Sequence, residues 1–387
     1  LTRLVIVFNM GFLTQTSLLV LFLFGVWGKE ESRAAPEHEM VIQLMDTYFS
    51  EERNHLGGRT ALERARKLIS ELMFGAGLDT RKLEFPTVLK GLQQLRFNAT
   101  IVEGLSKGKH WGTDKDRILL IAADYDTDLD LSNIIVDSSG IVAFLQLIDL
   151  YKQHHCQMRY TTVFLATMMK PSLVGNGGIS GGSFYLNEVL LPHLTKSNGT
   201  FLGAYFLDSV GNSNSQPNSQ LIADGFAAAF PETETLITNS GKKGNFMAVV
   251  ARHNTGDMGL FESFRESWGA SGNPVYSFPM KSKTGGHPVE EWLQQQHSAF
   301  WQTSSDRKIA SVLLTDTGNN RRPEKCADKE CNAHEIMTED NLNFLTRTSK
   351  TLNKLVLDAQ CGACSNQISK LTGLLLLLVL VRNFYPF

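Results

Sequence analysis

The chain has 387 residues, enough for one large domain or two ordinary ones with buried cores. Hydrophobic residues make up 42% of it, as in a globular protein, and 37 basic against 39 acidic residues give a net charge of -2. Because Lys and Arg are scattered rather than clustered, the composition argues against nucleic acid as a partner.

The amino terminus, residues 1–28, has the pattern of a secretory signal peptide that starts at Met10. Its apolar stretch runs from Ser17 to Trp27, and Val26 and Gly28 are small enough for the positions before a cleavage site. An uncleaved membrane anchor is the alternative. Residues 29–39 are polar and predict a linker to the folded domain.

Apolar patterns predict a single domain over residues 40–357. They place helices at 40–50, 60–74, 138–153, from 183 onward and at 341–357, and strands at 96–105, 116–124, 159–169, 203–208 and 308–316. Ser138 or Ser139 is the expected cap of the helix at 138–153. Helices that alternate with apolar strands predict an α/β fold of three layers, a mostly parallel, twisted sheet with helices on both faces.

The carboxyl-terminal segment, residues 358–387, predicts membrane attachment. An apolar run from Leu371 to Val381 follows small residues and a polar spacer, which is the pattern of a GPI-attachment signal with Gly362 as the attachment site. The run is shorter than the roughly 20 residues that a membrane-spanning helix needs, and a tilted transmembrane anchor is the alternative. Asn98 and Asn198 begin N-glycosylation sequons, which fits the same secretory route.

The cysteines fit an oxidising compartment once that tail is removed. The chain has five, and cleavage after Gly362 would remove one and leave an even number. Cys326 and Cys331 are close enough in sequence to form a disulfide with each other. The partners of Cys156 and Cys361 stay open.

Four charged residues come at the ends of predicted strands or directly after them. In a sheet of parallel strands these ends meet at one edge, which is where α/β proteins carry their binding and catalytic residues. The candidate site is therefore formed by Asp124, Lys170, Asp208 and Asp316.

An acidic run after the strand at 116–124 invites a calcium interpretation. A calcium loop needs glycine at its sixth position and a bidentate glutamate at its twelfth, and here these are Leu129 and Ile135. The run is therefore expected to be a solvated loop. Its alternating aspartates are Asp124, Asp126, Asp128 and Asp130.

A serine hydrolase is a second possibility for the site. Gly178 to Gly182 fits G-x-S-x-G, and Ser180, Asp208 and His297 follow in the order of α/β-hydrolases. A nucleophile elbow requires its serine directly after a strand, whereas a long glycine-rich loop precedes Ser180. We expect His297 to be a packed structural histidine.

Seven segments occur in a recognisable order: DRILLIAADYDT, VDSSGIVAFLQLIDLY, TTVFLATMM, GGISGGSFYL, AYFLDSVG, QHSAFWQ and SVLLTDTGNNRRP. Their order and spacing resemble the co-catalytic zinc aminopeptidase family (peptidase family M twenty-eight), over residues 40–357. That family includes secreted aminopeptidases, glutamate carboxypeptidases and glutaminyl cyclases. The resemblance implies two zinc ions bridged by an aspartate and a water molecule, with a glutamate as general base.

Three positions of the family's site carry aspartates in this chain. Asp124 stands where the resemblance implies a histidine ligand, Asp126 keeps the aspartate behind that histidine, and Asp208 keeps a carboxylate ligand.

Other positions have lost the chemistry that the resemblance implies. The bridging aspartate falls on Ile135, with Val136 beside it, and an alkyl side chain cannot bind a metal. The adjacent glutamates, general base and ligand, fall on Lys170 and Pro171. A lysine ammonium would repel a dication there, and it could act as a base only if burial lowered its pKa substantially.

The final histidine ligand is displaced as well. It falls near Lys325 and Cys326, and His334 could replace it only if the loop shifts. One ligand of five survives, so the sequence predicts a form of the fold without zinc or another cofactor. Lys170 is expected to form an internal ion pair with an aspartate of the site: Asp124, Asp126 or Asp208.

The sequence therefore predicts a catalytically inactive protein of aminopeptidase fold at the cell surface. Its partner would be a peptide or a protein, bound through the former substrate cleft, because a cleft is the surface that such a fold keeps. The alternatives are an active zinc exopeptidase, or a glutaminyl cyclase-type enzyme, with an altered set of ligands.

Overall fold

The computed structural model describes residues 36–91, 95–128, 134–154, 158–253, 255–270, 272–280, 290–302, 309–321 and 336–360. These residues belong to one of two compact units, Pro36–Phe387. The predicted signal peptide, every cysteine and Gly362 lie outside the described residues. No helix in the described ranges is both long and apolar enough to cross a membrane.

The described chain forms one sheet of eight strands in the order β1-β2-β4-β3-β5-β8-β6-β7. The central strands β4, β3, β5 and β8 are parallel. β2 runs antiparallel to both β1 and β4, and β6 runs antiparallel to β8 and parallel to β7. The strands are β1 (Asp79–Val88), β2 (Arg96–Ser106), β3 (Arg117–Asp124), β4 (Thr161–Thr167), β5 (Thr200–Leu207), β6 (Met247–Arg252), β7 (Val275–Met280) and β8 (Ser311–Thr315).

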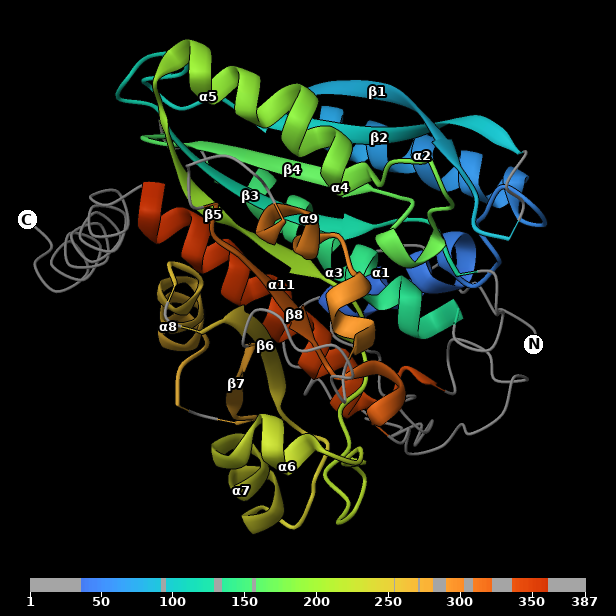
Figure 1. Ribbon diagram of the computed structural model, residues 1–387, viewed down its shortest axis with the longest axis vertical. Coiled ribbons are helices and arrows are strands. Elements are labelled where there is room, and N and C mark those ends of the chain that lie inside the picture. Colours follow the sequence, from blue (N-terminus) through green and yellow to red (C-terminus); the bar gives the residue numbers. More distant parts are fainter. Residues whose placement is uncertain are drawn as a thin grey trace, which may run out of the picture. The chain divides into compact units, whose positions relative to one another are not determined.

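Helices cover both faces of this sheet, and Figure 1 shows the long helices α3 and α11 beside each other. The longer helices are α1 (Pro36–Leu44), α2 (Arg59–Gly75), α3 (Ile134–Lys152), α7 (Pro231–Asn239), α8 (Asp257–Trp268) and α11 (Glu339–Gln360). The short ones are α4 (Gly181–Phe184), α5 (Leu191–Ser197), α6 (Phe226–Ala229) and α9 (His297–Trp301). The described residues also form short turns of other helix types. The π-helical turns are η1 (Met45–Phe49) and η4 (Tyr185–Leu190), and the 3-10 turns are η3 (Pro171–Leu173), η5 (Glu290–Gln294) and η6 (Gly318–Asn320).

Neighbouring side chains of β5 show how the layers are built. Successive residues of a strand point to opposite faces. Tyr205 packs against Phe264 of α8, and the next residue, Phe206, packs edge-on against Phe300 of α9. Hence α8 and α9 lie on opposite faces of one sheet.

The predicted fold class, a three-layer α/β fold with helices on both faces, is confirmed. Each strand and helix predicted from an apolar pattern is present. The strands β1, β6 and β7 were not predicted. β1 and β7 lie at the edges of the sheet, and β1 alternates charged with apolar residues, as edge strands exposed to water do.

Two predicted boundaries are wrong. α1 (Pro36–Leu44) includes residues of the expected linker, and α3 (Ile134–Lys152) includes Ser138 and Ser139, so neither serine caps its start. Ser138 lies within α3, where its hydroxyl donates to the carbonyl oxygen of Phe49 at 2.6 Å. The hydroxyl of Ser138 therefore bonds to main chain that is distant in sequence and does not cap its own helix.

Candidate functional site

The candidate site lies at the carboxyl edge of the four parallel strands. In the register of the sheet, Asp124 at the end of β3 is opposite Thr167 at the end of β4. The chain then leaves β4, β5 and β8 through non-glycine residues in the left-handed region: Met169 with φ 57°, Ser209 with φ 54° and Thr317 with φ 78°. Such conformations cost about 1–3 kcal/mol each and are common where a site fixes the backbone.

Lys170 is buried at this edge and pairs with Asp128. Its Nζ lies 3.1 Å from Oδ2 of Asp128, and the lysine side chain is 9% exposed against 38% for the aspartate. Burial raises the pKa values of Asp124 and Asp126, and the Lys170 ammonium offsets part of that rise. An internal ion pair was predicted for Lys170, and the pair recorded here is with Asp128 instead of the aspartates expected from the sequence.

Asp126 is buried and holds the chain after β4. Its Oδ2 accepts a hydrogen bond from the main-chain N–H of Met169 at 2.8 Å. Burial raises the pKa of Asp126 to about 7, although this hydrogen bond and the Lys170 ammonium both act to lower it. The expectation of a solvated acidic loop is wrong for Asp126, because this side chain is buried and bonds to the backbone after β4.

Gln296 closes the site over Asp124. Its Nε2 donates to Oδ1 of Asp124 at 2.9 Å and to the carbonyl oxygen of Met168 at 3.0 Å, while its Oε1 accepts the N–H of Gly182 at 2.7 Å. Gln296 is 2% exposed, so these bonds lie away from water. Burial raises the pKa of Asp124 well above its usual range, and the nearby carboxylates of Asp126 and Asp208 add to that shift. Sequence reasoning assigned no role to Gln296, although this residue begins the segment QHSAFWQ.

Asp316 anchors loops rather than facing a ligand. Its carboxylate accepts the N–H groups of Asn212 and Gly318 at 2.7 and 2.8 Å, and it is 1% exposed. Burial raises its pKa to about 6, against the influence of the buried Arg321. Asp208, at the end of β5, donates its main-chain N–H to the carbonyl oxygen of Leu314 at 3.2 Å.

The described side chains do not fit a pair of zinc ions. Zinc takes imidazole, thiolate or carboxylate ligands. Lys170 offers only N–H donors, and Pro171 offers no side-chain ligand. Within the described ranges, no group of three or more His, Cys, Asp and Glu side chains is placed to hold a metal ion. The side chains of Ile135 and Val136, and all of Lys325, Cys326 and His334, lie outside what the structure describes.

Ser180, Asp208 and His297 do not form the hydrogen bonds that a catalytic triad requires. Ser180 caps α4, where its Oγ accepts the N–H of Ser183 at 3.2 Å and donates to the Oγ of Ser183 at 3.0 Å. Neither ring nitrogen of His297 has a hydrogen-bond partner among the residues that the structure describes. A general base must reach its nucleophile, so this arrangement gives Ser180 no activating histidine.

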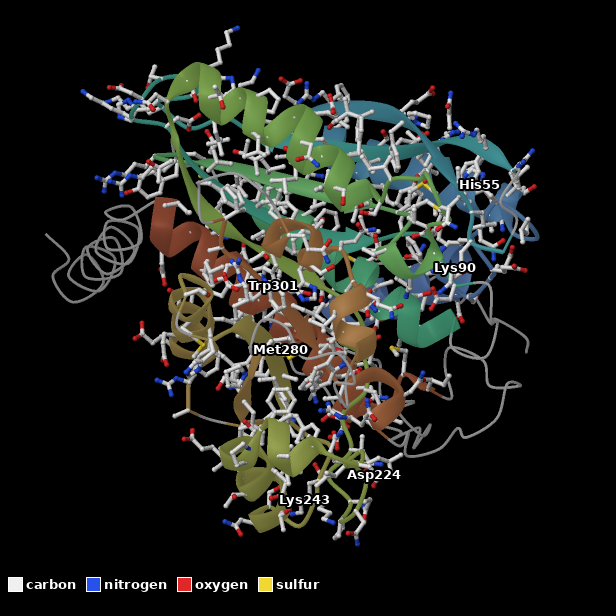
Figure 2. The ribbon with its side chains drawn as sticks, viewed as in Figure 1. His55, Lys90, Asp224, Lys243, Met280 and Trp301 are labelled. Carbon is white, nitrogen blue, oxygen red and sulfur yellow. The ribbon has the colours of Figure 1, made fainter. Side chains whose placement is uncertain are left out.

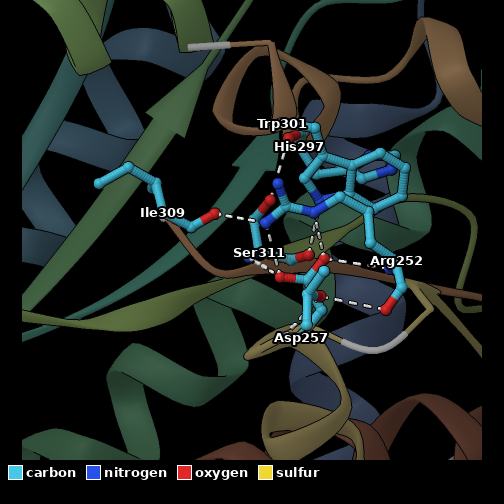
Figure 3. Close-up of polar contacts among 7 residues, drawn as sticks. Arg252, Asp257, His297, Trp301, Ile309 and Ser311 are labelled. Carbon is cyan, nitrogen blue, oxygen red and sulfur yellow. Dashed lines mark hydrogen bonds and ion pairs between the residues drawn. The ribbon is translucent and has the colours of Figure 1, made fainter. Parts of the chain in front are cut away.

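His297 is packed between aromatic rings, as predicted (Figure 3). Its imidazole meets Trp301 edge-on with 4.5 Å between ring centres, and it is fully buried. Beside it, Arg252 and Asp257 form a two-point ion pair with N–O distances of 2.8 and 2.9 Å. Burial, followed by the Arg252 cation, lowers the pKa of His297 to about 3.

The glycosylation acceptors are accessible. Asn98 lies in β2 and Asn198 follows α5, where it takes a left-handed conformation with φ 55°, and both are exposed. Modification of either residue stays a prediction. The predicted disulfide between Cys326 and Cys331 and the predicted attachment site Gly362 lie outside the described residues.

Comparison with known proteins gives a fold but no family by sequence. No protein-family model matches the chain, and no curated protein matches it. Its structure is similar to the glutaminyl cyclase of Porphyromonas gingivalis, with a TM-score of 0.54 and 11% identity over 83% of this chain and 99% of that one. It is also similar to a zinc aminopeptidase of Bacillus subtilis, with a TM-score of 0.52 and 12% identity over 84% of this chain and 94% of that one.

A third similar structure is the glutaminyl cyclase of Macrostomum lignano, with a TM-score of 0.52 and 13% identity over 83% of this chain and 88% of that one. The chain has the zinc aminopeptidase and glutaminyl cyclase fold. At identities this low the likeness concerns the fold, and it carries no catalytic residue over to this chain.

Replacing Lys170 should destabilise the protein. Lys170→Met leaves the buried Asp126 without its neighbouring cation, and we expect a loss of about 1–3 kcal/mol in the free energy of unfolding, less than for a fully buried pair because Asp128 is partly solvated. Lys170→Glu should lose more, because it adds a carboxylate. Denaturant unfolding measures both, with the exposed Lys90→Met as the matched control. A Lys170→Met variant as stable as the parent would contradict this interpretation.

Replacing His297 should flatten the acid side of the stability curve. In the unfolded chain the histidine pKa returns to about 6.5, so between this value and about 3 the unfolded state binds a proton that the folded state excludes. The free energy of unfolding therefore falls as the pH is lowered through this window, in the limit by on the order of 5 kcal/mol.

His297→Phe removes the histidine that titrates only in the unfolded chain. It also removes two buried ring nitrogens that have no hydrogen-bond partner among the described residues. We expect its advantage over the parent to grow between about pH 7 and about pH 4, as measured by urea unfolding at both values. Titrations of Asp126 and Asp316 occur in both proteins and cancel in the difference. Equal pH dependence in the two proteins would show that His297 is not excluded from protonation.

Proposed function

We propose that this protein is a catalytically inactive member of the aminopeptidase fold that binds a peptide or protein partner at the carboxyl edge of its parallel strands. This edge corresponds to the former substrate cleft. The proposal assigns no zinc, and no other cofactor, to the site.

The buried ammonium of Lys170 carries this proposal. The resemblance of the sequence places a general base at this position, and that base must take a proton from metal-bound water. A lysine held 3.1 Å from a carboxylate is stabilised in its charged form and cannot accept one. Gln296 supports the proposal, because its amide occupies an oxygen of Asp124.

The absence of zinc chemistry can be tested directly. The purified full chain, equilibrated with zinc and then dialysed, should retain far less than one zinc ion per molecule. Hydrolysis of aminoacyl-naphthylamides and cyclisation of glutaminyl peptides should equal those of an Asp124→Asn, Asp208→Asn double variant. Near-stoichiometric zinc, or activity that the double variant lacks, would instead support an exopeptidase or a glutaminyl cyclase.

Partner binding should depend on the edge of the sheet that bears the site. Lys90, labelled in Figure 2, directly follows the bridge residue Leu89 after β1 and binds the loop after β4 through its main-chain N–H, which donates to the carbonyl oxygen of Leu173 at 2.8 Å. Lys196 lies near the end of α5, a few residues before β5 begins. It is therefore close to the amino end of this parallel strand, opposite to the edge that bears the site.

Both lysines are exposed, so they form a matched pair. Peptides selected from a display library against the full chain should lose on the order of tenfold in affinity with Lys90→Glu and keep their affinity with Lys196→Glu. Equal losses with both variants would indicate a charge effect of the whole surface, and a loss with Lys196→Glu alone would move the binding surface to the other end.

We further propose that the protein is a secreted, GPI-anchored glycoprotein, which rests on the sequence signals alone. Phosphatidylinositol-specific phospholipase should release it from intact cells, and a stop codon before Leu371 should secrete it. Treatment with peptide N-glycosidase should increase its mobility, with Asn98→Gln, Asn198→Gln as the unglycosylated control. Retention on cells after the phospholipase would favour a transmembrane anchor.

A further inference from the structure

A buried arginine lies beneath the candidate site. Arg53, in the connection between η1 and α2, has no exposed surface. Taking a charge out of water is costly unless hydrogen bonds or other charges compensate for it. The groups that accept hydrogen bonds from Arg53 therefore identify the parts of the fold that this residue holds together.

The guanidinium group donates in several directions at once. Nε donates to the carbonyl oxygen of Tyr125 at 2.9 Å, and Nη2 donates to Oγ of Ser138 at 2.7 Å. Nη1 donates to the carbonyl oxygens of Phe49 and Glu51 at 2.9 and 2.8 Å. Only a planar fork can reach these separate acceptors, because a lysine presents all its donors at one point.

The main chain of Arg53 adds a second connection to the same segment. Its N–H donates to Oγ1 of Thr127 at 3.0 Å, and its carbonyl oxygen accepts the N–H of Thr127 at 2.9 Å. Tyr125 directly follows β3, and Ser138 lies early in α3. Arg53 thus holds residues 125–128, the described start of the connection between β3 and α3, and also Ser138 within α3.

That connection carries the acidic side of the candidate site. Asp126 fixes the chain after β4 through Met169, and Asp128 pairs with Lys170. Both aspartates flank Thr127, which the main chain of Arg53 holds through the Thr127 hydroxyl and the Thr127 N–H.

We propose that Arg53 is the positioning residue of the candidate site, which holds the β3–α3 connection so that Asp128 meets Lys170. The effect of Arg53 on partner binding rests on the proposed function, whereas its positioning of the Lys170–Asp128 ion pair does not. Because Arg53 is buried, it would act on a bound peptide only through the residues that it positions.

A double-mutant cycle tests the positioning in the full chain. The coupling between Lys170→Met and Asp128→Asn is measured by unfolding in three backgrounds: the parent, Arg53→Lys and Arg64→Lys. Arg64 is the control, an exposed arginine that pairs with Glu51 at 2.6 Å. We expect coupling in the parent and in Arg64→Lys, and none in Arg53→Lys, which keeps the charge but loses the fork.

Amide hydrogen exchange gives an independent readout. Protection of Tyr125 and Thr127 should fall by on the order of tenfold or more in Arg53→Lys, while amides of β6 and β8 keep their protection. Should Arg53→Lys fail to fold, Ser138→Ala removes one acceptor of the fork and should weaken the coupling in part. A merely structural role would lower the stability of every variant alike, and unchanged coupling in Arg53→Lys or Ser138→Ala overturns the proposal.

A binding measurement distinguishes failure of this proposal from failure of the proposed function. A peptide selected against the full chain should bind Arg53→Lys on the order of tenfold more weakly, since the surface is no longer preorganised. If no such peptide is obtained, the proposed function fails and the cycle still decides the role of Arg53. If the peptide binds Arg53→Lys as it binds the parent while coupling is lost, the positioned pair lies outside the binding surface.

Discussion

The charge of Lys170 at the carboxyl end of β4 is the feature around which the candidate site is arranged. Four parallel strands bring their ends to one edge, and aspartates from β3, its following loop and β5 gather there. A cation among them offsets part of the cost of burying several carboxylates. The Lys170 ammonium pairs with Asp128 and partly offsets the burial that raises the pKa values of Asp124 and Asp126.

Hydrogen bonds supply the geometry that this charge alone cannot. Gln296 joins β3, the chain after β4 and α4, and Asp126 fixes the left-handed turn at Met169. Arg53 holds the β3–α3 connection from below. Each of these groups is buried, so each must keep its partners, and together they leave little freedom for the residues at the strand ends.

A shared fold does not determine a shared reaction. The zinc aminopeptidase and the glutaminyl cyclases have a similar fold, yet chemistry depends on a few side chains of the site. In this chain the described side chains at that edge are aspartates, a lysine, a proline and a glutamine amide. Among the described residues, no three His, Cys, Asp or Glu side chains are placed to hold a metal ion.

The sequence by itself determined the central strands, the order of the elements and the edge that bears the site. Continuous apolar runs mark buried parallel strands, and residues directly after them must lie at one edge, so Asp124, Lys170 and Asp208 could be placed without coordinates. The edge strands β1 and β7 could not, because one exposed side removes the apolar signal.

Only the tertiary structure decided which groups meet at that edge. Gln296 reaches Asp124 across 172 positions of the chain, Arg53 reaches Ser138 across 85, and Lys170 pairs with Asp128 rather than with the aspartates that flank it in the expected arrangement. Such contacts depend on how loops and helix ends pack over the sheet. That packing is set by many weak interactions between distant segments, which no local pattern of residues records.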